Sequence, residues 1–342
     1  MSGATSPESH AQRRIRHPEV QAGGPAGFRG ASQPASGAKC DTGHLSGFRG
    51  KLKGTVAPEI TPSQIEQFRT QGFLVLREFL SSEDVQRARA RFEPLFRGEF
   101  ETGLYPDEWN WREDRDPPDR TRQICNGWKS DRTIANIVLA EKIGRICATL
   151  AGWTGARMGQ DNVVWKPPGA KALGFHQDNS YCHWVVPMGF TTCWMALDDT
   201  TAAGGTIEYA RGSHRWGLFP PIRQFHAPDD YREAVNQAAR SVGGKVDLVP
   251  IEVPAGGCVI HAGGTWHGSD ANRMPQPRRS LVTHCIAAEA RFHPAEVSYI
   301  YSRYRRVGDD TMDESFFPVL WTQSGYRTPF LESYCDSKST SR

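Results

Sequence analysis

The chain has 342 residues, of which 38% are hydrophobic and 10% aromatic, so it can bury one large core or two smaller ones. Its net charge of +3 is concentrated in residues 1–55, where eight Lys and Arg outnumber three Asp and Glu. The near-neutral remainder argues against nucleic acid as a partner, and no apolar run reaches the ~18 residues of a membrane span.

Residues 1–55 are rich in Gly, Ala, Ser and Pro, which predicts a disordered N-terminal tail; a flexible arm or a targeting segment is the alternative. Residues 56–342 are expected to form a single domain. The eight cysteines occur singly, without a C-x-x-C pair, which is typical of buried thiols in a reducing cytoplasm. The composition therefore predicts a cytoplasmic protein and leaves its oligomeric state open.

Capping residues mark the first predicted helices. Thr61 is a good N-cap, and Gly72 is placed to end the first helix. Ser81 opens a second helix that we expect to end before Pro94. Apolar residues at helical spacing predict a third helix over residues 133–150.

The second half of the sequence has a different pattern, which is typical of short strands. Short candidate strands, separated by Gly and Pro turns, lie at 158–165, 174–178, 191–197, 206–210, 251–253, 258–261 and 281–287. Helices followed by short strands without βα alternation predict an α+β fold, with a double-stranded β-helix (jelly roll, cupin-like) core and flanking helices. The helix-prone segment 227–244 either covers the site or is a surface helix.

Two short motifs supply a candidate metal site. His176 and Asp178 are two residues apart, so on a strand both side chains leave the same face. His267, in a Trp266-His267-Gly268-Ser269 phrase, can complete the set from a distant strand. Two histidines and one carboxylate are the facial triad of non-haem Fe(II) oxygenases.

An arginine follows His267 at a fixed offset. Arg278 lies eleven residues later, at the start of a predicted strand, where its guanidinium could bind the carboxylate of an acidic co-substrate. Arg279 is the rival, and alternation places the two on opposite faces. The eleven-residue offset favours Arg278.

Taken together, these motifs resemble the phytanoyl-CoA dioxygenase-like (PhyH) branch of Fe(II)/2-oxoglutarate oxygenases, over about residues 61–334. The resemblance rests on the H-x-D phrase, residues 72–76, 204–208 and 211–215, the H-G-S stretch and Arg278. It implies that His176, Asp178 and His267 bind the iron and that Arg278 binds the distal carboxylate of 2-oxoglutarate. It also implies that Gln160, Trp194 and Ser269 line the co-substrate pocket.

The resemblance implies a reaction as well. Fe(II), 2-oxoglutarate and O2 would oxidise a small-molecule substrate with release of succinate and CO2, and ascorbate is expected to stimulate turnover. We expect a specialised metabolite such as an antibiotic intermediate, contacted by Asn179, Tyr181 and Trp184. Asp178 argues against halogenation, because related halogenases have a small residue there. The acidic stretch 107–116 is either a solvated loop or a lid for a polar or cationic substrate.

Two other functions stay open from the residues alone. A cupin-type metal oxygenase without 2-oxoglutarate would not need Arg278, and a non-catalytic jelly-roll binding protein would need no intact triad. Zinc hydrolysis is disfavoured, because the sequence has no H-E-x-x-H helix. Succinate formation from 2-oxoglutarate separates these possibilities.

Overall fold

The computed structural model of the chain describes residues 59–335. The predictions about residues 1–55 lie outside this part. Within residues 59–335, none of the helices has the length and apolar character that crossing a membrane requires.

The first two helices begin as the capping residues predict. In α1 (Pro62–Gln71), the Thr61 side chain accepts a hydrogen bond from the backbone N–H of Gln64, and Gly72 ends the helix at φ 85°. The predicted end of the second helix is wrong, because α2 (Ser82–Phe96) continues through Pro94. Leu95 and Phe96 are fully buried, so packing stabilises this last turn despite the proline.

The predicted third helix is two helices. α3 (Arg132–Val138) and α4 (Glu141–Ala151) are separated at Ala140, whose backbone is extended with ψ 134°. Val138 and Ile143 are five positions apart, more than one helical turn. The break changes the phase of the apolar face, so both helices can bury their isoleucines.

The strands form two main antiparallel sheets, as expected for a jelly roll. The major sheet has the order β1 (Phe73–Leu76), β10 (Cys258–Ala262), β7 (Thr191–Ala196), β12 (Arg278–Ala287), β4 (Gly155–Lys166), β3 (Arg122–Cys125) and β2 (Glu108–Trp109), with β14 (Val319–Thr322) also paired to β4. The minor sheet has the order β5 (Leu173–His176), β11 (His267–Ser269), β8 (Ile207–Ala210) and β9 (Leu248–Pro250). A small third sheet pairs β6 (Val185–Val186) with β13 (Arg291–Phe292). The α+β jelly-roll prediction is confirmed.

One predicted strand is misplaced. Residues 251–253 do not form a strand, because β9 ends at Pro250. The carbonyl of Ile251 accepts hydrogen bonds from the side chains of Thr200 and Thr206, and the Val253 carbonyl accepts one from the backbone N–H of Thr200. Ile251 and Val253 are buried, but threonine hydroxyls take the place of a regular strand partner.

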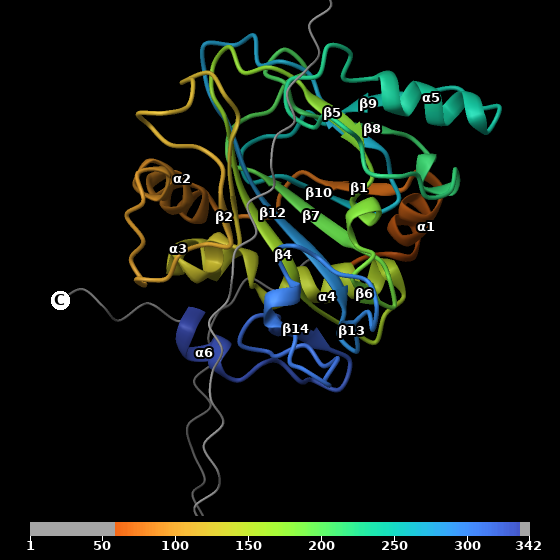
Figure 1. The fold of residues 1–342 in the computed structure, drawn as a ribbon. Helices are drawn as coiled ribbons and strands as arrows, with labels where there is room; N and C mark the ends of the chain where they lie inside the picture. The colour runs from red at the N-terminus through yellow and green to blue at the C-terminus, as the bar shows by residue number, and fades with distance from the viewer. Residues whose placement is uncertain (1–58, 336–342) are drawn as a thin grey trace, which may run out of the picture. The chain divides into compact units, whose positions relative to one another are not determined.

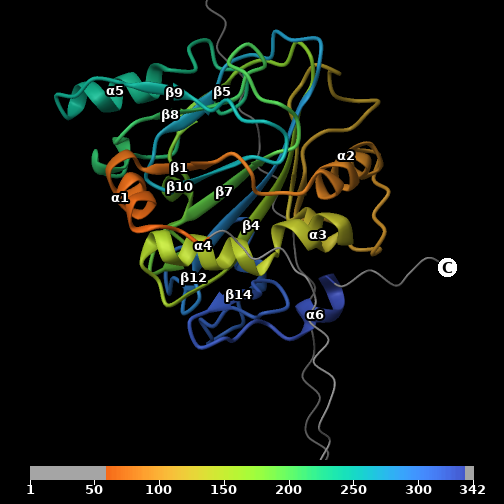
Figure 2. The ribbon, with the colours of Figure 1, turned by 180° about the vertical axis from the view of Figure 1, so that it is seen from behind.

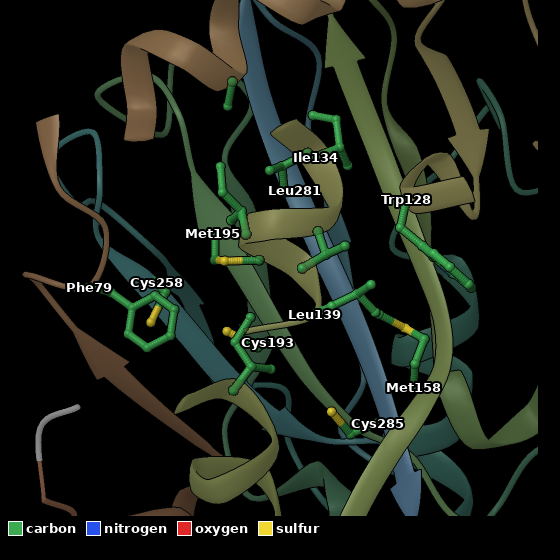
Figure 3. Close-up of a cluster of buried hydrophobic side chains, with 14 of the residues drawn as sticks. Phe79, Trp128, Ile134, Leu139, Met158, Cys193, Met195, Cys258, Leu281 and Cys285 are labelled. Carbon is green, nitrogen blue, oxygen red and sulfur yellow. The ribbon is translucent and has the colours of Figure 1, made fainter. Parts of the chain in front are cut away.

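The two faces of the major sheet have different surroundings. Its outer face packs against α3 and α4, which cross the strands in Figure 2. Figure 3 shows part of this apolar layer, including Met195, Leu281 and Cys285. The inner face turns toward the minor sheet, where Trp194 and Val282 share a cluster with Ile207 and Tyr209. Alternation along β7 and β12 therefore assigns successive residues to a helical layer and to the space between the sheets.

The helix-prone segment 227–244 contains α5 (Glu233–Ser241), which lies beside the minor sheet in Figure 1. Its Val235 and Ala238 pack against Phe175 and Trp266. Phe175 and His176 are consecutive on β5, so α5 covers the face of the strand opposite to His176. The helix therefore supports the minor sheet from outside. The last helix, α6 (Phe330–Cys335), packs its Leu331 against the outer layer.

Candidate metal centre

Three side chains of the predicted triad converge between the sheets. His176 at the end of β5 is paired across the strands with His267 at the start of β11. Asp178 begins a short 3-10 helix, Asp178–Tyr181, but Gln177 keeps an extended backbone, so the alternation of side chains is preserved. Asp178 Oδ1 lies 3.7 Å from His176 Nε2 and 3.5 Å from His267 Nε2. One ligand atom of each residue lies within 4.8 Å of the others.

Backbone carbonyls fix the tautomers of both histidines. His176 Nδ1 lies 3.0 Å from the carbonyl of Gly174, and His267 Nδ1 lies 3.0 Å from that of Thr265. A carbonyl only accepts, so each Nδ1 carries the proton and each Nε2 has a free lone pair. Burial lowers the pKa of His176 to about 3 and that of His267 to about 4, which keeps both rings neutral at pH 7.

The two oxygens of Asp178 have different roles. Oδ2 accepts hydrogen bonds from Thr192 Oγ1 at 2.7 Å and His261 Nε2 at 2.9 Å, while His284 Nδ1 lies 3.3 Å away. Burial alone would raise the pKa of Asp178, but the imidazoles of His284 and His267 and the bond from His261 hold it well below the usual range. The carboxylate is therefore ionised, with Oδ1 left toward the histidines.

Sequence reasoning missed the two histidines that orient Asp178. His261 donates to Asp178 through Nε2, so its Nδ1 accepts from the Tyr209 hydroxyl at 2.8 Å. His284 Nδ1 lies 2.8 Å from Thr192 Oγ1, and its Nε2 accepts from the Asn162 amide at 3.0 Å. The parity of β12 could have indicated His284, because residues 278, 280, 282 and 284 share one face.

These residues fit a divalent metal ion. The free ligand atoms are two imidazole nitrogens and one carboxylate oxygen, the donor set of a facial triad. Each ligand is also hydrogen-bonded through its other polar atom, which is how proteins orient metal ligands. The arrangement leaves room in the coordination sphere for a chelating co-substrate.

The structure places Arg278 and Arg279 on opposite faces of β12. Arg278 is 4% exposed, and its Nη1 donates to Ser280 Oγ at 3.1 Å. Burial lowers its pKa to about 10, so it stays protonated at neutral pH. Arg279 forms an ion pair with Asp198 at 2.8 Å on the outer face. Arg278 is thus the one directed between the sheets.

The three residues predicted to line the co-substrate pocket lie on the inner faces of the sheets. The Arg278 guanidinium lies 5.6 Å from the centre of the Trp194 ring. Ser269, two residues after His267 on β11, accepts a hydrogen bond from Lys166 Nζ at 2.8 Å. Gln160 is farther along β4, where its Nε2 donates to Asn162 at 3.1 Å and its Oε1 accepts from Tyr301 at 2.6 Å.

The three predicted substrate contacts lie in different surroundings. Tyr181 is 39% exposed, with its ring 6.2 Å from that of His176, so it lies at the edge of the site. Asn179 holds a neighbouring segment of backbone, because its side chain accepts a hydrogen bond from the backbone N–H of Phe190 at 2.8 Å. A Cβ at Gly263 would come 2.1 Å from this side chain, so the site loop requires glycine there. Trp184 is buried in a separate apolar cluster with Phe292 and Phe317.

The loop of residues 217–225 lies beside His176. The Phe225 ring lies 4.8 Å from the His176 ring. Gln177 holds the start of this loop, because its side chain donates to the carbonyls of Gly217 and Gly264 and accepts from the N–H of Phe219. Gln177 therefore ties the loop to the segment that precedes His267.

Most of the acidic stretch 107–116 is neutralised by basic side chains. Asp107 pairs with Lys129 at 2.8 Å, and Asp116 pairs with Arg115 and Arg120, each at 2.8 Å. Glu108 differs, because it lies on β2 directly opposite Cys125 and contacts its Sγ at 3.3 Å. Burial raises the pKa of Glu108.

Comparison with known proteins agrees with this fold. The family model described as phytanoyl-CoA dioxygenase (PhyH) matches residues 68–280. A phytanoyl-CoA dioxygenase from Arabidopsis thaliana is 23% identical over 265 residues, covering 68% of this chain and 91% of the relative. An ectoine dioxygenase from Nocardia farcinica is 24% identical over 245 residues, covering 68% of this chain and 79% of the relative.

Among solved structures, the non-haem α-ketoglutarate-dependent carbocyclase SnoK from nogalamycin biosynthesis has the same fold, with a TM-score of 0.58. It is 21% identical and covers 78% of this chain and 98% of its own. The matched family model spans most of the chain, which therefore belongs to the phytanoyl-CoA dioxygenase family. The enzyme is an iron- and 2-oxoglutarate-dependent dioxygenase, as the sequence motifs predict.

Proposed function

We propose that His176, Asp178 and His267 bind the iron, that Arg278 binds the distal carboxylate of 2-oxoglutarate, and that the substrate is a small polar specialised metabolite. The observation that carries the first part is the convergence of two Nε2 lone pairs and one ionised oxygen. The buried guanidinium of Arg278 on the same inner face supports the second part.

Each residue of the site then has a defined task. The bound iron and 2-oxoglutarate supply the activation of dioxygen. Gly174 and Thr265 keep the imidazole protons on Nδ1, and Thr192 with His261 keeps Asp178 ionised and oriented. The Phe225 ring packs against that of His176, while Tyr181 at the edge of the site is the residue we expect to meet the substrate.

A row of polar side chains supports a polar substrate. On the inner face of the major sheet, Asn162 Oδ1 accepts hydrogen bonds from Gln123 at 2.9 Å, Gln160 at 3.1 Å and Cys125 at 3.0 Å. Glu108 extends the row beyond Cys125. Such a row lines this part of the inner face with carboxamides and one carboxylate, which suit the hydroxyl or amino groups of a polar substrate better than a purely apolar one.

Some of the relatives support a specialised-metabolite substrate. SnoK is described as a carbocyclase from nogalamycin biosynthesis and one curated relative is named an ectoine dioxygenase, whereas another is named a phytanoyl-CoA dioxygenase. We extend this to a specialised-metabolite substrate for the present enzyme, without carrying over any of these compounds.

The test is the production of succinate. Purified protein with Fe(II), ascorbate and 2-oxoglutarate should form succinate in a manner that a matching substrate accelerates, and a panel of amino sugars, amino acids and polyketide glycosides should identify that substrate. Acceleration only by acyl-CoA esters or apolar lipids would reject the polar-substrate proposal. An absence of any succinate would reject the co-substrate assignment.

We also propose that the protein works in the cytoplasm. The cysteines of residues 59–335 form no disulfide with one another, and two adjacent pairs, Cys147 with Cys285 and Cys193 with Cys258, are hydrogen-bonded as thiols. A reducing compartment suits this arrangement. Fractionation of the producing cells would test it.

A further inference from the structure

A second buried cation lies beside Arg278. In the register of β12 and β4, Arg278 is directly opposite Lys166, so both side chains leave the same face of the sheet. Lys166 is fully buried, and Arg278 is 4% exposed. Two positive side chains are therefore adjacent between the sheets, close to the strand that carries His267.

Neither side chain has a carboxylate partner among the described residues. Lys166 Nζ donates to Ser269 Oγ at 2.8 Å and to the backbone carbonyl of Asp270. Arg278 donates to Ser280, and its Nε has no partner within residues 59–335. Burial and the charge of Arg278 hold the pKa of Lys166 well below its usual range, as expected for an ammonium without a counter-ion.

The acidic side chains near this pair are bound elsewhere. Asp198, which acts on Arg278, is paired with Arg279 at 2.8 Å and Arg89 at 3.2 Å. Asp270 pairs with Arg273 at 2.9 Å, and Glu208 pairs with Arg232 at 3.2 Å. Two adjacent buried cations are costly unless an anion compensates them, and no carboxylate of residues 59–335 forms an ion pair with either.

We propose that Lys166 and Arg278 form one two-cation pocket that binds the distal carboxylate of 2-oxoglutarate, with Lys166 as a direct ligand. This inference rests on the proposed co-substrate role of Arg278. Ser269 connects the pocket to the metal site, because it binds Lys166 and lies two residues after His267. The fork of Arg278 and the ammonium of Lys166 would approach the carboxylate from neighbouring strands. Selectivity for a keto diacid over a keto monoacid would follow from the pair.

The test compares two keto acids that differ only at the distal end. Binding of 2-oxoglutarate and of 2-oxovalerate to the anaerobic Fe(II)-loaded enzyme is measured by calorimetry for the wild type, Lys166→Met and Arg278→Met. We expect Lys166→Met to weaken 2-oxoglutarate binding about tenfold to a hundredfold, the range of a charged hydrogen bond, and to leave 2-oxovalerate unchanged. Equal weakening of both acids, or no change in either, would overturn the role of Lys166.

Lys142 provides the matched control. It is a partly buried lysine of α4 on the outer side of the major sheet, where it donates to the carbonyl of Phe79 at 2.6 Å. Lys142→Met should leave the affinity for both keto acids unchanged. A selective loss in Lys142→Met equal to that in Lys166→Met would show that the effect is not local, and would also overturn the inference.

Arg278→Met distinguishes a failure of the two-cation pocket from a failure of the proposed function. If it selectively weakens 2-oxoglutarate binding and Lys166→Met does not, the proposed function stands and the two-cation pocket fails. If neither variant affects 2-oxoglutarate, the co-substrate assignment of the inner face fails as well.

A readout without metal keeps the inference testable should the variants fold poorly. In the metal-free wild type, glutarate should raise the melting temperature more than its neutral diamide, glutaramide, does, because only a carboxylate can neutralise the two cations. Lys166→Gln, a second neutral variant, should lose most of that difference. Equal stabilisation of the wild type by both compounds would overturn the pocket.

Discussion

The two faces of the major sheet show how one set of strands serves two tasks. Along β12, Leu281 and Cys285 contact the helical layer, while Arg278, Ser280 and His284 lie on the face toward the minor sheet. Leu281 and Cys285 are apolar and close-packed, whereas the three inner residues are polar and hydrogen-bonded, Arg278 to Ser280 and His284 to the neighbouring strands. The stability of the fold thus resides mainly on one face, and the chemistry on the other. Substitutions of neighbouring residues on one strand should therefore have separable effects.

The largest expected effect is on the inner face. His176→Ala or His267→Ala should abolish turnover and iron binding, because each removes one of three ligand atoms. Metal analysis of the purified variants and succinate formation check this. His183→Ala is the control, since His183 is exposed and bonded only to the Val297 carbonyl. Full activity in either ligand variant would remove that residue from the site.

The next effect is on the outer face. Leu281 is fully buried against the helices, so Leu281→Ala should lower the free energy of unfolding by about 2–5 kcal/mol, as for other large-to-small core substitutions. Its KM for 2-oxoglutarate should be unchanged. The adjacent Ser280→Ala should raise the KM for 2-oxoglutarate and leave the free energy of unfolding nearly unchanged, because Ser280 accepts a hydrogen bond from Arg278. Denaturant unfolding and steady-state kinetics on both variants would show whether either substitution changes both the free energy of unfolding and the KM for 2-oxoglutarate.

A smaller effect separates the two neighbouring arginines. Arg278→Ala should raise the KM for 2-oxoglutarate by one to two decades, corresponding to roughly 1.5–3 kcal/mol for a charged hydrogen bond. Arg278→Lys should recover only part, because a point charge replaces a planar fork. Arg279→Ala should change this KM little, since Arg279 pairs with Asp198 on the other face. A larger defect in Arg279→Ala would contradict the assignment of the two faces.

The last effect is a pH dependence of stability, and it concerns the one carboxyl of β4, which is buried toward the outer side. Asp161 accepts from the backbone N–H of Trp128 at 3.1 Å, and burial raises its pKa to about 7. Between about pH 4 and pH 7 the folded protein keeps a proton that the unfolded chain has lost. Stability should therefore fall as pH rises, by at most about 1.4 kcal/mol per pH unit.

Asp161→Asn isolates this contribution. The variant should lack the added slope between pH 4 and pH 7, while other groups titrate as in the wild type. Melting temperatures of the two proteins across this range give the comparison. Parallel curves would show that Asp161 is ionised in the folded state throughout.

Local patterns were enough to predict much of the fold and the three candidate metal ligands. Thr61 and Gly72 mark helix ends through their own backbone chemistry, and the H-x-D spacing needs only an extended backbone. The alternation of a strand was also enough to separate Arg278 from Arg279. Each of these inferences depends on residues close together in the chain.

The features that the sequence did not reveal depend on register between distant strands. His261 and His284 reach Asp178 only because β10, β7 and β12 are neighbours in a particular alignment. Lys166 meets Arg278 through the pairing of β4 with β12, more than one hundred residues apart. The division of residues 132–151 into two helices likewise follows from packing against the sheet, which overrides good helix propensity.

The alternation of the major sheet also separates the candidate metal site from three buried cysteines. Cys193, Cys258 and Cys285 lie on the helical side, behind a continuous layer of hydrogen-bonded backbone, whereas Cys125 contacts the polar row at Asn162. An oxidant that escapes during futile turnover would meet Trp194 and Cys125 before it reached the thiols behind the strands. Peptide mapping of enzyme inactivated without substrate should then find damage at these inner positions, with the outer cysteines intact. The sheet would then be a barrier that confines oxidation by the enzyme's own reaction to side chains on its inner face.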